Sequence, residues 1–156
     1  MDDERRLVER LLRHWRKVVA WGSGFPRFDE IDPWMVGEDQ PRCLLVAVKL
    51  PVELSRFVWV GDKLLPELSG KAVALCPADT LVGVLLLHLP QVLSARRCLI
   101  AEGRATLGSV TVLYRGGLFP LSADGVAVDH MLVAAPYRLL RADEETPPPF
   151  SRTRWI

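Results

Sequence analysis

Few side chains of this 156-residue sequence could do chemistry, and His130 is notable because its neighbours are apolar. In the run GVAVDHMLVA it alternates with Val126, Val128 and Leu132, while Asp129 belongs to the opposite set. Alternate residues of a β-strand face the same side, so the pattern predicts His130 on an apolar sheet face. There it either lines a ligand pocket and orients a carboxylate or carbonyl, or it is a core or interface histidine bonded to the backbone.

His88 follows LVGVLLL, a run that predicts a buried helix in which Leu85 shares the histidine's face. A neutral imidazole in such a helix could bind haem iron, so His88 is a metal ligand only if haem is bound. Pro90 follows two residues later and could bend that turn away, and a lone histidine in an apolar helix is usually structural. We therefore expect no cofactor, with haem as the minor alternative.

The sequence holds no recognisable catalytic motif. It lacks G-x-S-x-G, a P-loop, G-x-G-x-x-G and H-E-x-x-H. Ser122, Asp124 and Asp129 are close in sequence, but Ser122 and Asp124 fall in an SADG turn, where such residues serve backbone geometry. The three cysteines form no C-x-x-C pair, which argues against a disulfide framework or a structural zinc site. We expect a protein that is not an enzyme.

Glu102, Arg104 and Arg115 are predicted to lie on neighbouring strands. The usual outcome is a cross-strand ion pair on the solvent face. An arginine that reached inward would instead favour an anionic ligand through its paired donors.

The composition narrows the class of protein. Nearly half of the residues are hydrophobic, a quarter are charged and the formal net charge is +1, as in a globular domain with no affinity for nucleic acid. The longest apolar run, LVGVLLLHL, is far shorter than the roughly 20 residues of a membrane helix. The charged N-terminus is unlike a secretory signal. We expect a soluble cytoplasmic protein without membrane insertion.

The elements that would position these residues follow from periodicity. Residues 3–20 carry apolar side chains at steps of three and four, which predicts an amphipathic helix that Gly22 ends. Its apolar side is predicted to cover the sheet or a dimer mate, with Trp15 as the anchor. The interface candidates are Leu7, Leu11, Leu12, Trp15 and Val19.

The rest of the chain predicts strands around a helical middle. Runs 43–48, 56–60, 98–105, 108–121 and 125–136 are predicted to be strands, and short helical turns precede a buried helix capped by Asp79. This gives an α+β fold with a five-stranded antiparallel sheet, helices on one face and the N-terminal helix. The predicted organisation is an amphipathic helix over 1–22, a domain over 23–140 and a disordered Pro-rich tail over 141–156.

From about residue 15 to residue 140 the chain resembles the PAS domains, and among them a family of small, often free-standing bacterial proteins. The markers are Trp21 with PRFDEIDP at 26–33, FVWVG at 57–61, ELSG at 67–70 and YRGGLFPLSADGVAVDHML at 114–132. It departs from the family at His130, where the family usually has another hydrophobic residue. The polar residues that surround the photoreactive cysteine of flavin-binding relatives are missing around Cys76.

The resemblance implies a sensory or docking module in signalling. We expect a non-enzymatic module that acts through homodimerisation and through docking to an unidentified signalling protein, with or without modulation by a ligand. The alternative is a small-molecule sensor with an internal cavity, and a remote alternative is a small-molecule enzyme on the same scaffold. The pocket candidates for a sensor are His88, His130, Leu85, Val128, Leu132 and Cys76.

Overall fold

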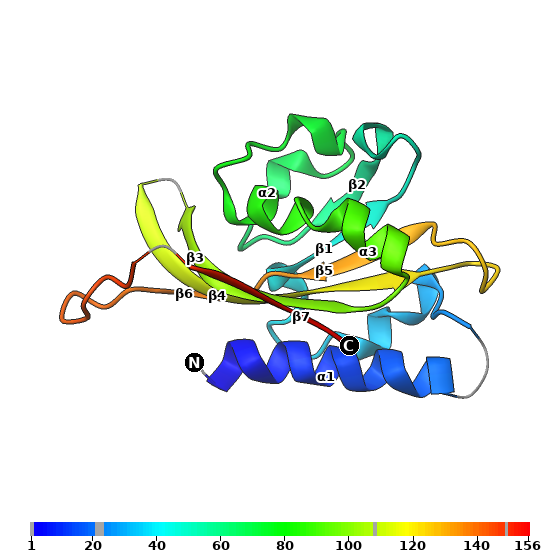
Figure 1. The fold of residues 1–156 in the computed structure, drawn as a ribbon, viewed down its shortest axis with the longest axis horizontal. Helices are drawn as coiled ribbons and strands as arrows, with labels where there is room; N and C mark the ends of the chain where they lie inside the picture. Colours follow the sequence, from blue (N-terminus) through cyan, green and yellow to red (C-terminus); the bar gives the residue numbers. More distant parts are fainter. Residues whose placement is uncertain (1, 21–23, 108, 149) are drawn as a thin grey trace.

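The computed structural model describes residues 2–20, 24–107, 109–148 and 150–156, and in these residues the chain is an α+β protein with a seven-stranded antiparallel sheet (Figure 1). Trp21, Gly22 and Gly108, which the sequence interpretation used, lie outside the described residues. The strands are β1 Cys43–Ala47, β2 Arg56–Val60, β3 Leu99–Leu107, β4 Val110–Leu121, β5 His130–Ala134, β6 Tyr137–Leu139 and β7 Ser151–Trp155. The α-helices are α1 Asp2–Ala20, α2 Leu81–Leu86 and α3 Leu89–Ala95. The 3-10 turns are η1 Phe28–Glu30, η2 Asp32–Trp34, η3 Gln40–Arg42, η4 Val52–Leu54, η5 Pro66–Leu68 and η6 Val73–Leu75.

The strands lie in the order β2-β1-β5-β4-β3-β7, and β6 pairs with the far part of β4. The predicted antiparallel pairing of the first two strands is confirmed, with Leu44 opposite Val60 and Ala47 opposite Arg56. The register of β3 and β4 places Glu102 opposite Arg115. The pairs β1–β2, β3–β4 and β4–β5 join neighbours in sequence, whereas β1–β5, β4–β6 and β3–β7 join strands that are further apart in the chain.

Each face of the sheet has its own core. α2, α3 and the turns η4, η5 and η6 cover one face, and α1 with the turns η1 and η2 lies beneath the other (Figure 1). Successive side chains of β5 point to opposite faces of the sheet. Met131 and Val133 belong to the core under α2 and α3, whereas Leu132 and Ala134 belong to the core above α1. We call these the α2/α3 core and the α1 core.

The side of α1 that was predicted to face the sheet or a dimer mate packs on the sheet of its own chain. Leu7, Leu11, Leu12 and Trp15 are buried in the α1 core, and the Trp15 indole Nε1 donates a hydrogen bond to the Pro120 carbonyl at 2.8 Å. The interpretation of these four residues as a dimer surface is corrected, because β4 and β5 supply the apolar cover. Val19, the fifth candidate, is 38% exposed.

The predicted buried helix is two short helices. Pro90 stands in the first turn of α3, where its missing N–H costs nothing, so α2 ends at Leu86 and α3 begins at Leu89. The N-cap is Thr80 instead of Asp79, and its hydroxyl accepts a hydrogen bond from the Gly83 N–H at 3.1 Å. None of the helices in the described part of the chain combines the length and the apolar character that spanning a membrane requires.

The expectation of a five-stranded sheet followed by a disordered tail is wrong. Tyr137–Leu139 forms β6 on β4, and Ser151–Trp155 forms β7 on the free edge of β3. The backbone of β3 gains partners there, and Trp155 packs against the α2/α3 core while Ile156 packs against the α1 core. The Ile156 N–H donates to the Cys98 carbonyl at 3.0 Å.

Candidate functional site

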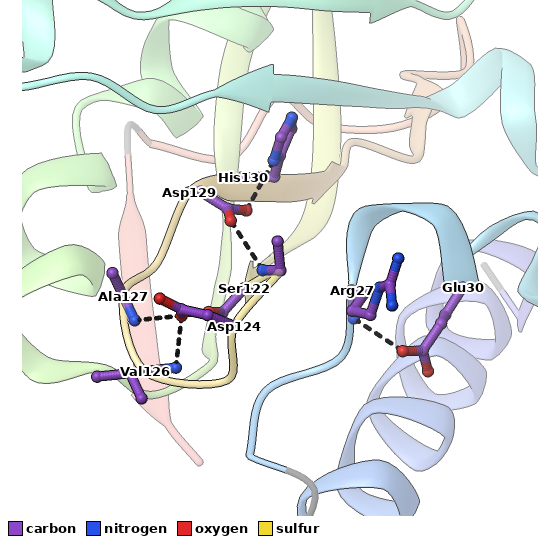
Figure 2. A network of polar contacts seen from close by, with 9 residues as sticks. Arg27, Glu30, Ser122, Asp124, Val126, Ala127, Asp129 and His130 are labelled. Carbon is purple, nitrogen blue, oxygen red and sulfur yellow. Dashed lines mark hydrogen bonds and ion pairs between the residues drawn. The ribbon is translucent and has the colours of Figure 1, made fainter.

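The polar residues near His130 form a network at one end of the sheet, in the loop between β4 and β5 (Figure 2). Asp124 accepts hydrogen bonds through Oδ1 from the backbone N–H groups of Val126 and Ala127 at 2.8 and 2.9 Å, and from the Ser122 hydroxyl at 2.9 Å. These three bonds hold the pKa of the Asp124 carboxyl below its usual value. The carboxylate thus fixes the turn, in which Gly125 has a left-handed φ of 78°.

His130 is the first residue of β5, and its ring contacts Asp129 through a nitrogen and Phe28 through a face. Its Nδ1 lies 2.7 Å from Asp129 Oδ1, and Asp129 Oδ2 accepts from the Ala123 N–H at 2.7 Å (Figure 2). The imidazole stacks on the Phe28 ring with centroids 4.4 Å apart. The side chain of His130 is 18% exposed, on the α1 side of the sheet.

The predicted alternation with Val126 and Val128 is wrong. β5 begins only at His130, because the Asp124 turn diverts residues 125–129 from the sheet. Val126 is exposed and Val128 packs against the α2/α3 core, so His130 shares its face with Leu132 alone among the predicted set.

In this network the Ser122 hydroxyl and the His130 imidazole bind different carboxylates. Ser122 is buried and its hydroxyl donates a hydrogen bond to Asp124, while His130 is hydrogen-bonded to Asp129. The serine–histidine form of nucleophilic catalysis needs the hydroxyl to be hydrogen-bonded to the imidazole. The arrangement closes the end of the sheet: the Ser122 N–H donates to the Pro26 carbonyl at 2.8 Å and the Val48 N–H donates to the Asp129 carbonyl at 2.8 Å.

The remaining pocket candidates lie elsewhere. Leu85 is fully buried where α2 approaches β4 at Gly116, and His88 is the half-buried N-cap of α3 with a side-chain hydrogen bond to Gln91. Burial lowers the pKa of His88. Cys76 is half-buried beside Thr80, with Sγ 3.7 Å from Oγ1, and burial raises the pKa of its thiol.

The six pocket candidates do not converge in the described structure. Leu85, Val128 and Cys76 pack in or against the α2/α3 core, whereas Leu132 lies in the α1 core on the opposite face. A single cavity cannot be lined by both faces of one sheet. Binding of a small molecule by any of them stays a prediction.

The cysteines and acids of the described residues bring no metal-binding group together: no cluster of three or more His, Cys, Asp or Glu side chains is found among them. Cys43 and Cys98 are buried, and burial raises the pKa of both thiols. The expectation that these two are small buried apolar residues is confirmed.

A cluster of arginine and glutamate lies between α1 and the strands β3, β4 and β7. The predicted cross-strand pair is present, with Arg115 Nη1 4.0 Å from Glu102 Oε2, and Arg115 Nη2 also lies 3.2 Å from Glu9 Oε1 on α1. Arg104 instead donates to the Pro147 carbonyl at 2.7 Å. A cleft of about 460 Å³ opens here, lined by Ile100, Glu102, Arg115, Arg152, Thr153 and Arg154.

The contribution of β7 to this cluster was not predicted from the sequence. Arg152 and Arg154 alternate with Thr153 and Trp155, which is a strand pattern. The high charge and the three prolines before it led to the prediction of a tail without structure.

A second missed contact holds α1 to the segment before β1. The His14 ring stacks on Trp34 with centroids 5.6 Å apart, and Arg10 forms an ion pair with Asp39. Burial and the cations Lys17, Arg10 and Arg13 lower the pKa of His14. Both contacts join α1 to residues at least twenty positions later, so no local pattern signals them.

Comparison with known proteins gave no match among protein-family models, curated proteins or solved structures.

Proposed function

We propose that the protein is a non-enzymatic docking module on a PAS-like scaffold, which acts in signalling by binding another protein. The order β2-β1-β5-β4-β3, with α2, α3 and short helical turns over one face, is compatible with the PAS resemblance of residues 15–140. α1 and β7 are additions to that scaffold.

The observation that carries the proposal is the use of both sheet faces by the chain itself. α1 packs on one face of the sheet, and α2 and α3 pack on the other. The hydrogen bonds of Asp124 and His130 stabilise the loop between β4 and β5. Another molecule would therefore bind to the outer surface of the domain. Binding at an outer surface is typical of a macromolecular partner.

Homodimerisation is part of this proposal, but through a surface other than the buried side of α1. Leu7, Leu11, Leu12 and Trp15 would have to leave their own core to reach a second copy. Such an exchange exposes the sheet residues that they cover, which is costly in water.

The test is a native mass spectrum of the freshly purified protein beside its denatured mass, with light scattering over a range of concentrations. We expect the bare chain mass and a dimer in light scattering, and a monomer at every concentration would overturn the homodimerisation. An added mass on each chain that disappears on denaturation would overturn a pure docking role in favour of the small-molecule sensor. A haem-sized addition that is lost in a His88→Leu variant would assign the iron ligand.

A further inference from the structure

Among the described residues, the outer side of β7 carries backbone groups that pair with no other strand. In the described residues β7 is the last strand of the sheet and pairs only with β3. The Arg104 N–H donates to the Phe150 carbonyl at 3.2 Å and the Ile156 N–H donates to the Cys98 carbonyl. Hydrogen bonds alternate along an antiparallel strand, so Arg152 and Arg154 face β3 with their backbone groups, and Ser151, Thr153 and Trp155 direct theirs outward.

The side chains along this edge leave an excess of positive charge. Arg154 Nη2 lies 3.7 Å from Glu9, and Arg152 Nη1 lies 3.7 Å from Glu102. Arg115 contacts both of these carboxylates, so three guanidinium groups share two acids. Arg152 and Arg154 are 73% and 57% exposed, and their weak ion pairs leave donors for a further anion.

The basic surface continues onto α1. Arg13, Arg16 and Lys17 are exposed on the helix beside Glu9, the residue that Arg154 contacts. A surface of one sign attracts the opposite sign over roughly one Debye length, about 8–10 Å at physiological salt. An acidic partner would therefore be steered toward this edge.

A second copy of the chain is the less favourable occupant. An antiparallel pairing of β7 with β7 of another copy would place Arg152 and Arg154 of both chains together on one face. Like charges directly opposite one another destabilise a sheet. An extended peptide with acids at alternate positions meets the same arginines with the opposite charge.

We propose that the β7 edge binds an acidic, extended segment of a partner protein. The segment adds as a further strand, its backbone bonds to Ser151, Thr153 and Trp155, and its alternate carboxylates lie against Arg152 and Arg154. This inference rests on the proposed docking function and names its surface and the chemistry of its partner.

The probe is a fluorescent peptide, Thr-Glu-Val-Glu-Val-Glu-Thr, titrated by anisotropy against the full chain at low and at moderate salt. We expect binding that weakens with salt and that weakens at least about tenfold in the double variant Arg152→Glu, Arg154→Glu. A peptide with lysine in place of glutamate should not bind. The matched control is Arg56→Glu with Lys71→Glu, the same charge change on exposed residues at the opposite edge, and it should bind as the parent does.

Thr153→Pro separates strand addition from simple charge attraction. Proline removes an N–H that points outward, so the bonds between β7 and β3 stay while a ladder bond to the peptide is lost. We expect weaker peptide binding with unchanged amide protection of Arg154 in hydrogen exchange. Equal binding by parent and Thr153→Pro would overturn strand addition.

The native mass spectrum keeps this proposal distinct from the docking function. A bare chain mass with no peptide binding would overturn the β7 site and leave the docking function standing. A small molecule bound to each chain would overturn the pure docking role whatever the peptide does. Protection of residues 151–155 that rises with protein concentration would show a second copy at the edge and overturn the acidic partner.

Discussion

Trp15 connects α1 to the sheet of its own chain. A large aromatic side chain on an amphipathic helix is a common interface anchor. Here its ring is buried in the α1 core and its indole N–H is bonded to Pro120, a residue on β4. The Trp15 side chain therefore stabilises the single chain directly.

We predict that Trp15→Phe lowers the free energy of unfolding by about 1–3 kcal/mol, because a buried carbonyl loses its donor and the smaller ring packs less well. Urea unfolding followed by circular dichroism measures this. Val19→Ala on the same helix is the control, with a change within about 0.5 kcal/mol expected at an exposed site. Unchanged stability of Trp15→Phe, with loss of a dimer, would restore the interface interpretation.

The surroundings of His130 could be predicted only in part from the sequence pattern. Its place beside the apolar residues of β5 could be predicted, because Leu132 follows at the strand spacing. The start of β5 could not be predicted, because the N–H groups of Val126 and Ala127 donate to Asp124 and not to a neighbouring strand. Phe28, its stacking partner, lies about a hundred residues earlier and leaves no local signal.

At the scale of elements, local chemistry decided what could be predicted. β2 has the predicted bounds and β1 ends one residue early, because both are short, largely apolar runs bounded by turn-forming residues. β7 was missed because its stability comes from distant partners, with Leu99 opposite Trp155 and Ile100 opposite Arg154. A charged segment becomes a strand when an unpaired edge is within reach.

At Gly103, β3 closely approaches Phe150, the residue that precedes β7. A Cβ atom at this position would lie 2.6 Å from the Phe150 carbonyl oxygen and 2.8 Å from the Tyr114 hydroxyl. Both distances are shorter than van der Waals contact, so the strand or the tyrosine would have to move.

We predict that Gly103→Ala destabilises the protein by about 1–3 kcal/mol and loosens β7 first. Hydrogen exchange should show faster exchange for the amides of Arg152 and Arg154, with the amides of β1 unchanged. Ser109→Ala, at an exposed position near the end of the same hairpin, should leave β7 protected. Equal exchange of the β7 amides in the parent and Gly103→Ala would contradict the close approach.

At the scale of the whole molecule, stability should depend on pH through two histidines on opposite faces of the sheet. Burial lowers the pKa of His14 and of His88 from the ordinary value of 6.5. The unfolded chain then binds more protons than the folded chain as the pH falls past that value. The stabilisation is fully present above pH 6.5 and decreases below it.

We predict a lower free energy of unfolding at about pH 5.5 than at about pH 7.5, and a flatter dependence in the double variant His14→Gln, His88→Gln. Other shifted groups act outside this window: Arg138 holds the pKa of Glu144 at about 2, and the thiols titrate above 9. Denaturant melts at the two pH values measure the slope. An identical slope in parent and double variant would assign the dependence to other groups.

The distance along the chain between α1 and the strands it covers has a consequence for biosynthesis. Trp15 bonds to a carbonyl 105 residues later, and Glu9 pairs with an arginine 106 residues later. Contacts of such long range form slowly, since a large loop must close before they stabilise anything. A nascent chain that has not yet released β4 and β5 from the ribosome therefore carries the apolar side of α1 uncovered. During that interval the helix is a natural substrate for chaperones, and the yield of folded protein depends on how long the interval lasts.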